Sequence, residues 1–533
     1  MDRINVLDCT LRDGGYCNQW NFGHKNINSI INGLICSNVE IIECGILSNN
    51  IEYYKDSTLF NCVEQITEYI QDKGKDRMFV CLANYGEYIL ENLPEYDGKS
   101  VQGIRLAFHK KDLNEALRAC EVIKEKGYKV FVQPMVSLNY SDEEFLNLVH
   151  QVNKLEPYAF YIVDSFGAIT ERDLKRLFLL ADHNLKTNIC IGFHSHNNMQ
   201  LAYSNAQTLT GIQTSRVLII DCSVMGMGRG AGNLNTELFV EYLNQTFEKY
   251  YSTAPLLVMI DKILGKFYSE NYWGYSLANY LSAKHNLHPN YAKYLTDKQT
   301  LTVEDIDRIF IMMEQEKKVG YDKNYIENLY MIYMGKKDVK IDHLNELCMQ
   351  LRNKEVLIIA PGNSSKEEKE KIIAYMKKSK TVTISINFDY PYYKTDYIFY
   401  SNLRRYETIT DNQKNKCIVT SNIPADDVYM KTRYTDLLND NEYVRDNAGM
   451  LLIKFLMNFK IKKIILAGMD GYEERAKNNY FEETMAFSTQ TKDAFVKNKA
   501  MTEMLSEFAK IVKIEFLTEQ KYIYIEDKCL LVE

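Results

Sequence analysis

The sequence lacks the features that mark membrane, secreted and nucleic-acid-binding proteins. Although 46% of its 533 residues are hydrophobic, no apolar run has the length of a membrane span, so we expect a soluble globular protein. Met1 to Asn5 lead almost directly into an apolar run and leave no room for a signal peptide. The 12 cysteines form no disulfide framework, and the net charge of −7 offers no basic surface for nucleic acid. These absences predict a cytoplasmic protein with neither a membrane nor a nucleic-acid partner.

The first 220 residues contain eight short apolar runs, most of them rich in Val, Ile, Leu or aromatic residues. The runs are Ile4 to Cys9, Val39 to Cys44, Met78 to Leu82, Gly103 to Ala107, Lys129 to Gln133, Ala159 to Val163, Asn188 to Phe193 and Arg216 to Ile220. This composition is typical of buried parallel strands. Roughly 20 to 35 residues separate the runs, much of it with helical periodicity, as in Leu113 to Lys126 and Asp142 to Leu155. Eight repeats of strand and helix predict a TIM barrel.

Polar residues stand at or just after seven of the eight predicted strands. In a TIM barrel the chemistry lies in the loops at the carboxyl ends of the strands, so these side chains are expected at one mouth. They are Arg12 and Asp13, Glu43, Arg105, Gln133, Asp164, His194 with His196, and Asp221.

The pair His194 and His196 suggests a metal site. Residues two apart on an extended segment point the same way, so both imidazoles can reach one ion. A lone His-x-His pattern is more often incidental than a ligand pair. Asp13 supplies a third ligand if the barrel closes and brings the first strand beside the last two. One carboxylate and two imidazoles leave coordination positions open, which is typical of a catalytic site.

Several segments resemble the DRE-TIM metallolyases, a family that includes HMG-CoA lyase, isopropylmalate and homocitrate synthases, and 4-hydroxy-2-oxovalerate aldolase. The opening segment Leu7 to Gly15 reads Leu-Asp-Cys-Thr-Leu-Arg-Asp-Gly-Gly and resembles the family's first signature. The later matches are Ile42 to Gly45 with the second-strand Glu, Val163 to Gly167 with the sixth-strand Asp-Ser, Gly192 to Asn198 with the His-x-His, and Gly226 to Asn233 with Glu237 as the glycine-rich loop. The ordered combination covers roughly residues 1 to 285 and is more specific than any single motif.

The resemblance implies a divalent-metal-dependent carbon–carbon lyase or aldolase that forms or uses the enolate of a pyruvate-type 2-oxo acid with an aldehyde partner. The implied metal is Mn²⁺ or Mg²⁺, with Zn²⁺ as an alternative, and the relatives suggest a homodimer. Val163 to Ala168 is closest in appearance to the oxovalerate aldolases. The residues implied are Asp13, His194, His196 and Asn233 for the metal, Arg12, Tyr16 and Glu43 for catalysis, and Arg105, Gln133, Asp164 and Ser165 for substrate binding.

Other roles remain open for some of these residues. Arg12 would stabilise the enolate oxygen as a permanent cation, but an ordinary salt bridge to Asp13 or Glu43 is the alternative. Asn233 is either a further contact to metal or substrate, or a turn residue in a glycine-rich loop. Tyr16 stands where the similar aldolases carry a proton-transferring His, and a phenol with an ordinary pKa near 10 is a poor general base.

The alternative proton carriers include metal-bound hydroxide and side chains both within and beyond the barrel. The candidate residues are Glu43, Cys44, His285, His288 and Tyr291. The alternative role of the two histidines beyond the barrel is to cap a helical segment, and neither is assigned to the metal.

Beyond the barrel the pattern changes twice. We expect a TIM-barrel domain over residues 1–285, a helical extension over 286–350 that forms a lid, a dimer element or a structural collar, and a Rossmann-like doubly wound domain over 351–533. Val356 to Ala360 passes through a Pro-Gly-Asn-Ser-Ser loop into a predicted helix over Lys366 to Lys380. Further strands are predicted at Val382 to Ile386, Tyr397 to Tyr400, Cys417 to Thr420, Ile464 to Ala467 and Lys513 to Phe516.

The third domain is predicted to bind rather than to catalyse, because no histidine follows His343. Its first loop lacks the full GxGxxG or Walker pattern, so phosphate binding there has little support from the motif.

The sequence leaves two alternatives to an aldolase open. One is a Claisen-type synthase that joins an acyl-CoA to a 2-oxo acid, and the other is a catalytically altered barrel whose C-terminal domain binds a nucleotide or sugar nucleotide.

Overall fold

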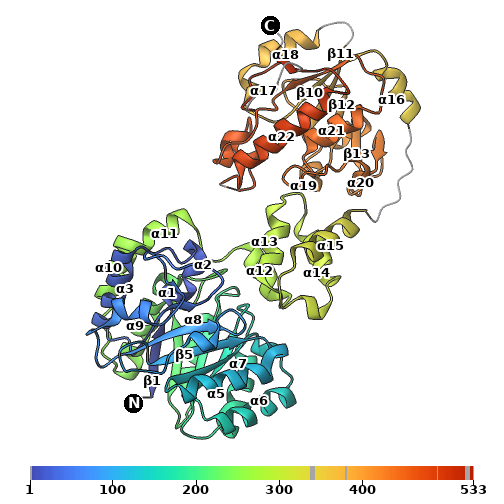
Figure 1. Cartoon of the computed structure of the whole chain (residues 1–533). Helices are drawn as coiled ribbons and strands as arrows, with labels where there is room; N and C mark the ends of the chain where they lie inside the picture. The colour runs from blue at the N-terminus through green and yellow to red at the C-terminus, as the bar shows by residue number, and fades with distance from the viewer. Residues whose placement is uncertain (1–2, 336–342, 378–380, 489, 523–528, 532–533) are drawn as a thin grey trace. The chain divides into compact units, whose positions relative to one another are not determined.

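A computed structural model describes residues 3–335, 343–377, 381–488, 490–522 and 529–531 (Figure 1). The chain forms two compact units. Unit 1 comprises Met1–Lys293 and Glu314–Tyr321, and unit 2 comprises Tyr294–Met313 and Asp322–Glu533. The predicted division into three domains stays a prediction. Among the described residues, no helix is both long and apolar enough to cross a bilayer.

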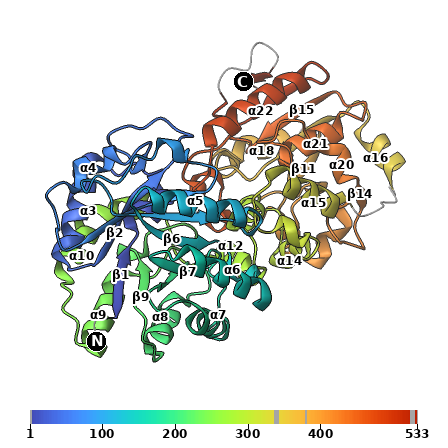
Figure 2. The ribbon, with the colours of Figure 1, turned by 60° about the horizontal axis from the view of Figure 1, so that its bottom comes forward.

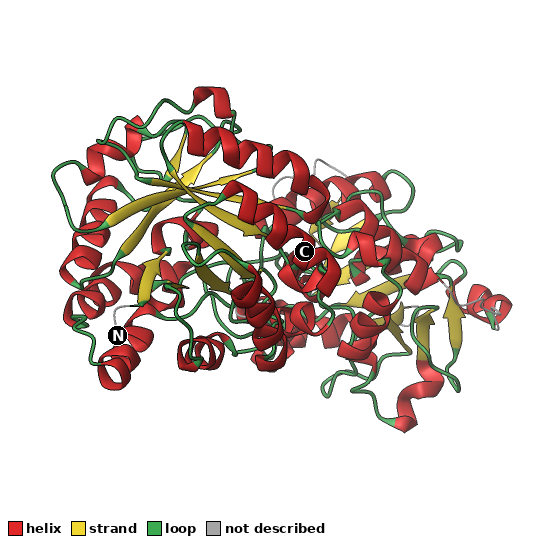
Figure 3. Cartoon of the chain, turned by 90° about the horizontal axis from the view of Figure 1, so that it is seen from below, coloured by secondary structure: helices red, strands yellow, loops and turns green. Residues whose placement is uncertain are grey.

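Unit 1 contains a closed barrel of parallel strands, which confirms the predicted TIM barrel. The strand order is β1-β9-β8-β7-β6-β5-β4-β2, and pairing of β1 with β2 closes the ring. Figure 2 shows β1 between β2 and β9, and Figure 3 shows helices around the barrel strands. The strands are β1 (Ile4–Asp8), β2 (Ile41–Leu47), β4 (Met78–Asn84), β5 (Gly103–Phe108), β6 (Lys129–Pro134), β7 (Ala159–Asp164), β8 (Cys190–Ser195) and β9 (Leu218–Cys222). A short strand that the sequence did not predict, β3 (Leu59–Phe60), pairs with the end of β2.

Two properties of the sequence explain the alternation of strands and helices. The strands β2, β5 and β7 are buried along their whole length, as their continuous apolar composition predicts. Capping boxes begin two of the helices: Ser141 with Glu144 at α6, and Thr170 with Asp173 at α7. The helices of this part are α1 (Thr10–Asp13), α2 (Gly15–Asn18), α3 (His24–Cys36), α4 (Glu64–Ile70), α5 (Leu113–Glu125), α6 (Asp142–Leu155), α7 (Glu171–Asn184), α8 (Ala202–Gly211), α9 (Thr236–Phe247), α10 (Ala254–Met259), α11 (Gly265–Glu270) and α12 (Leu277–Lys284).

Helices follow the barrel, as predicted. They are α13 (Pro289–Asp297), α14 (Val303–Ile311), α15 (Lys323–Gly335) and α16 (Leu344–Leu351). His285 is the C-cap residue of α12, which agrees with the capping alternative for that histidine.

Unit 2 contains a second parallel sheet, also as predicted. Its order is β14-β13-β12-β11-β10-β15-β16-β17, so the chain enters at β10, builds outward on one side, and later returns to the other side of β10. The strands are β10 (Glu355–Ile359), β11 (Thr381–Ile386), β12 (Tyr397–Tyr400), β13 (Cys417–Thr420), β14 (Met430–Thr432), β15 (Lys463–Ala467), β16 (Ile514–Phe516) and β17 (Cys529–Leu531). The helices are α17 (Ser364–Glu367), α18 (Lys369–Met376), α19 (Leu403–Tyr406), α20 (Tyr434–Leu437), α21 (Ala448–Leu456) and α22 (Ala494–Ala509).

Two details of unit 2 differ from the prediction. The segment predicted as one helix over Lys366 to Lys380 is two helices, α17 and α18, which break at Glu368, and its last residues lie outside the described ones. The short strands β14 and β17 were not predicted, because three residues are too few to give a periodic pattern.

Candidate metal centre

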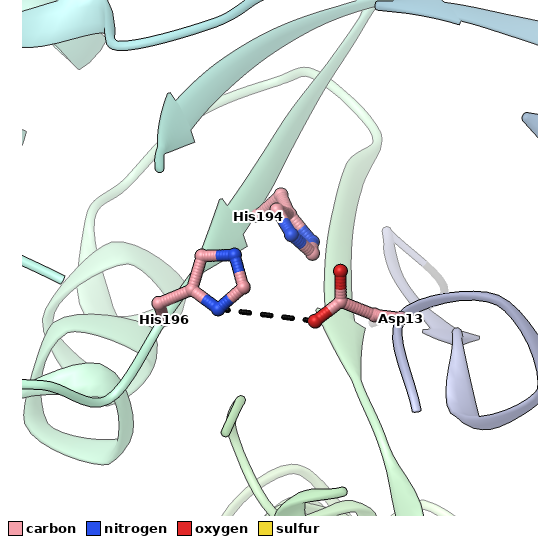
Figure 4. Close-up of side chains that lie close together, drawn as sticks. All are labelled: Asp13, His194 and His196. Atoms are coloured by element: carbon pink, nitrogen blue, oxygen red, sulfur yellow. Dashed lines mark ion pairs between the residues drawn. The ribbon is translucent and has the colours of Figure 1, made fainter. Parts of the chain in front are cut away.

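Three buried side chains at the barrel mouth form a group that can hold a metal ion. Asp13 ends the short helix α1 directly after β1, while His194 lies on β8 and His196 lies just beyond it. Their exposed fractions are 1%, 3% and 5%, and their ligand atoms all lie within 4.8 Å of one another (Figure 4). Because the carboxyl ends of β1 and β8 meet in the closed barrel, residues about 180 positions apart in the chain converge here.

The surroundings hold the acid and one imidazole in the protonation states that a metal requires. Burial alone would raise the pKa of Asp13, but Arg12 and the two histidines hold it well below its usual range. Burial lowers the pKa of His196 to about 3, despite the attraction of Asp13. Asp13 is therefore ionised and His196 neutral at physiological pH, as metal ligands must be.

Asp221 orients His194. The Nδ1 atom of His194 lies 3.0 Å from Oδ2 of Asp221, so Nε2 is the ring nitrogen left for a metal. The Asp221 carboxylate also accepts hydrogen bonds from Arg105 and, at 3.0 Å, from the Tyr161 hydroxyl. A carboxylate behind a ligating imidazole is a common device for fixing the tautomer and orientation of that ligand. Sequence analysis placed Asp221 at the mouth but gave it no role.

His196 and Asn233 present buried polar atoms that no hydrogen bond satisfies. Among the described residues, Nδ1 of His196 and Oδ1 of Asn233 have no hydrogen-bond partner, although both side chains are buried. The His196 atom lies 3.8 Å from Oδ2 of Asp13, and the Asn233 amide donates to the same oxygen at 2.8 Å. Buried acceptor atoms in proteins normally have a partner, and a cation bound between these two atoms and the ionised carboxylate would be that partner. The donor set therefore fits a divalent metal.

A buried network of charges surrounds Arg12. Its guanidinium donates from Nη1 to Asp13 and from Nε to Glu43 at 2.8 Å, while Nη2 is buried without a partner among the described residues. Glu43 also lies 2.8 Å from Arg105, which is fully buried. With its amide oxygen turned toward Arg105, Gln133 accepts from Nε and Nη2 of that guanidinium. Arg12 thus makes the salt bridges that sequence analysis offered as its alternative role, and it keeps one donor free.

Two of the residues predicted to bind substrate, Asp164 and Ser165, also hold the loop after β7 in place. The Asp164 carboxylate accepts from the backbone N–H groups of Ala168 and Ile169 at 2.8 and 3.1 Å, and burial raises its pKa to about 7. The Ser165 hydroxyl accepts from Val136 N at 2.9 Å. The motif that carries these residues is explained by loop geometry, and a contact of either with substrate stays a prediction.

Tyr16 and Arg229 lie near the metal ligands with less burial. Tyr16 is 42% exposed, packs edge-on against Trp20, and has the Arg229 guanidinium 5.6 Å from its ring centre. Arg229 also donates its backbone N–H to Asp13 Oδ2 at 3.3 Å. The sequence placed Arg229 in the glycine-rich loop but indicated no role for its side chain. That loop comes close to Asp13 because it carries Gly228, where a Cβ atom would lie 2.6 Å from the carboxylate.

Several known proteins are similar to this chain over its barrel. A family model described as HMGL-like matches residues 105–253. A curated protein named 4-hydroxy-2-oxovalerate aldolase from Geobacillus genomosp. 3 is 28% identical over 45% of this chain and 71% of its own length. One of the same name from Carboxydothermus hydrogenoformans is 29% identical over 45% and 70%. A solved N-terminal domain of a candidate aldolase from Bacteroides vulgatus is 27% identical, covers 57% of this chain and 99% of its own, and has a TM-score of 0.49.

The family model and the similar aldolases support placing the barrel in the DRE-TIM metallolyase superfamily. The relatives support a lyase-type enzyme within that superfamily.

Proposed function

We propose that the barrel is a divalent-metal-dependent carbon–carbon lyase that makes or uses the enolate of a pyruvate-type 2-oxo acid, with an aldehyde as the second substrate. The observation that carries the proposal is the buried group of Asp13, His194 and His196, with the free donor of Arg12 beside it. The names of the similar aldolases support the same reaction class.

Asp13, His194 and His196 would hold the metal, with Asn233 as a fourth contact. Mixed carboxylate and imidazole ligands suit Mn²⁺, Mg²⁺ and Zn²⁺ to different degrees, and availability in the cell then decides among them. A bound divalent ion supplies Lewis acidity that stabilises negative charge on a substrate oxygen.

Arg12 would stabilise the same developing charge from the protein side. Glu43 and Asp13 fix two of its nitrogens, so the remaining Nη2 donor is held in place before substrate arrives. A preorganised cation in a water-poor site stabilises an enolate oxygen without reorganisation during the reaction. We assign to Glu43 the positioning of Arg12, since two guanidinium groups share its Oε2 atom.

Tyr16 would move a proton at the aldehyde end. Its side chain is partly exposed, and a phenol is a better proton donor to an alkoxide than a base toward a carbon acid. Burial raises the pKa of Tyr16, and the Arg229 guanidinium beside the ring offsets only part of that rise, so the phenol keeps its proton until an alkoxide takes it. In the addition direction the phenol would give its proton to the new alkoxide, and in cleavage the phenolate would take that proton back from the substrate hydroxyl, so Tyr16→Phe is expected to slow both directions more than enolisation of pyruvate.

The test is cleavage of racemic 4-hydroxy-2-oxopentanoate with Mn²⁺, followed through the pyruvate released. The wild type is expected to release pyruvate. Arg12→Lys is expected to lose on the order of 10²-fold in kcat, because a Lys ammonium group cannot replace the planar set of guanidinium donors that Asp13 and Glu43 hold in place. His196→Ala should be inactive, while His150→Ala, at an exposed histidine on α6, should match the wild type. Release of free CoA from an acyl-CoA and a 2-oxo acid, without cleavage activity, would favour a Claisen-type synthase instead.

A further inference from the structure

Arg229 brings a cation without a carboxylate partner to the mouth of the barrel. It lies in the glycine-rich loop after β9, and its backbone N–H donates to Asp13 Oδ2 at 3.3 Å, so the residue stands directly beside the candidate metal group. Its guanidinium extends to the loop after β7, where Nη2 donates to the Ser165 carbonyl oxygen at 3.0 Å. In the part of the chain that the structure describes, Arg229 makes no ion pair.

The contacts of Arg229 within the protein leave most of its donors unused. A guanidinium carries five N–H donors, and here one backbone carbonyl oxygen accepts from one nitrogen. The Tyr16 ring, whose centre lies 5.6 Å from the guanidinium carbon, adds a cation–π contact that does not neutralise the charge. A further cation beside a bound divalent ion is unfavourable unless an anion lies near both. The position of Arg229 therefore indicates that an anion binds at this side of the mouth.

Two neutral histidines lie near the same guanidinium. Burial lowers the pKa of His288 to about 3, and the charge of Arg229 contributes to this decrease. Burial also lowers the pKa of His109, again with a contribution from Arg229. Both rings are therefore uncharged at neutral pH, and a neutral imidazole has one N–H group to donate.

Each of these rings has a nitrogen available for a ligand. The backbone N–H of Asn290 donates to Nδ1 of His288 at 3.2 Å, so the proton of the neutral ring is on Nε2. The same ring lies between the centres of Phe166 at 6.3 Å and Tyr321 at 5.9 Å, which restrict its orientation. Nδ1 of His109 is buried, and no residue that the structure describes forms a hydrogen bond with it. Buried polar atoms normally have a partner, and a bound ligand would supply one.

Carboxylates in the neighbourhood do not neutralise Arg229. Asp112 and Glu87 oppose its effect on the pKa of one of the histidines, but neither forms an ion pair with it. Glu87 is exposed and accepts from a side-chain amide at 3.0 Å. Asp13 is paired with Arg12 and belongs to the candidate metal group. The positive charge of Arg229 is thus left for a ligand.

The anion belongs to the second substrate rather than to the 2-oxo acid. Under the proposed function, the 2-oxo acid lies at the metal with Arg12 beside it, while Tyr16 moves a proton at the aldehyde end. Arg229 lies against the Tyr16 ring, so a group that it binds is joined to the aldehyde.

We propose that the second substrate is an aldehyde that carries an anionic group, a carboxylate or a phosphate, and that Arg229 binds this group. His109 and His288 would donate hydrogen bonds to the same group. Arg229 is thus the residue that determines which aldehydes react, and this assignment rests on the proposed function of the barrel.

The test compares three pairs of aldehydes in the addition direction, with saturating pyruvate and Mn²⁺. Each pair consists of a neutral and an anionic aldehyde: butanal and succinic semialdehyde, glycolaldehyde and its phosphate, and D-glyceraldehyde and its 3-phosphate. Proton NMR follows the consumption of both substrates after the metal is chelated. At least one anionic aldehyde is expected to exceed its neutral partner by about tenfold or more in kcat/KM, because the guanidinium adds charge-assisted hydrogen bonds. The pairs also show whether the anion is a carboxylate or a phosphate.

Substitutions of Arg229 measure its share of this preference. Arg229→Gln is expected to lower the ratio of the two kcat/KM values by about tenfold or more. Arg229→Lys keeps the charge without the planar set of donors and should lower the ratio by less. Both rates are measured on one protein sample, so a fraction of unfolded protein would leave the ratio unchanged. Arg118→Gln, at an exposed arginine of α5, is the matched control and should keep the wild-type ratio.

Exchange of the pyruvate methyl protons in D₂O separates this inference from the proposed function. Wild-type protein that exchanges these protons, yet uses no anionic aldehyde faster than its neutral partner, would overturn the inference alone. An unchanged ratio in Arg229→Gln would do the same. A higher KM for pyruvate in that variant, with an equal loss for every aldehyde, would show that Arg229 holds the 2-oxo acid instead. Absence of both proton exchange and aldehyde consumption would overturn the proposed function, and the inference with it.

Discussion

At the scale of single residues, the protein depends on buried charges that hold one another in place. Asp13, Glu43 and Asp221 each face an arginine, and every one of these carboxylates is at most 1% exposed. Such groups are costly to bury unless they are paired, and they give the site its fixed geometry. The sequence predicted which of these residues meet, because each lies on a barrel strand or shortly after one. It did not predict the pairings, since the direction of a side chain within the mouth depends on packing.

Asp221→Asn tests the orientation of His194. The variant removes a charge from behind the ligating imidazole, and the affinity for Mn²⁺ is expected to fall by about 10- to 100-fold. Tyr161→Phe is the matched control, since it removes only the hydrogen bond at 3.0 Å to the same carboxylate. It should change the affinity by no more than about fivefold, equivalent to one hydrogen bond of about 1 kcal/mol. Equal effects in calorimetric titrations of the two variants would show that Asp221 does not act through His194.

Asp8 gives the barrel a pH dependence. Burial raises the pKa of Asp8 to about 6 from an ordinary value of 3.8, although Thr236 and Thr10 donate to it. The native state therefore keeps a proton that the unfolded state loses, so this contribution to stability is present below about pH 4 and lost as the pH rises through about 6. The shift corresponds to at most about 3 kcal/mol. The melting temperature of the wild type relative to Asp8→Asn should be higher near pH 4 than near pH 7, and a constant difference would contradict this account.

At the scale of secondary-structure elements, the strands and most helices of the barrel follow from apolar pattern and capping. The predicted Asp142 to Leu155 coincides with α6, and the predicted start of β5 at Gly103 is correct. Elements that depend on tertiary contacts did not show in the sequence. β3 is two residues long and exists through its pairing with β2, and the helix predicted from Lys366 breaks because Glu368 has non-helical backbone angles.

Gly192→Ala tests how β8 supports the site. A Cβ atom at Gly192 would lie 2.2 Å from the Tyr161 ring, whose hydroxyl holds Asp221. The variant should lose about 1–3 kcal/mol of stability through overpacking and should bind Mn²⁺ more weakly as Tyr161 is displaced. Gly211→Ala at the end of α8 is the control, because no atom lies within 4 Å of the new methyl group. Urea unfolding and metal titration of both variants measure these effects. Unchanged metal affinity in Gly192→Ala would show that the packing of β8 against Tyr161 does not support the metal site.

At the scale of the whole molecule, the candidate metal group lies in unit 1. The sequence indicated this placement through its histidines, because His194 and His196 follow a predicted barrel strand and no histidine follows His343.

Tryptophan fluorescence can follow unit 1 by itself. Both tryptophans of the chain, Trp20 and Trp273, belong to that unit. Mg²⁺ at about 100 times its Kd should stabilise the fluorescence-detected transition by about 2.7 kcal/mol, and the same addition should leave His196→Ala unchanged. An equal effect of Mg²⁺ on His196→Ala would place the metal elsewhere.

The most direct test of the central claim is proton NMR of pyruvate in D₂O with the protein and Mn²⁺ or Mg²⁺, read after the paramagnetic ion is chelated away. The account predicts deuteration of the pyruvate methyl group by the wild type and none by His194→Ala, because enolisation requires the metal that His194 helps to hold. Absence of exchange with either metal, or exchange that persists in His194→Ala, would contradict it.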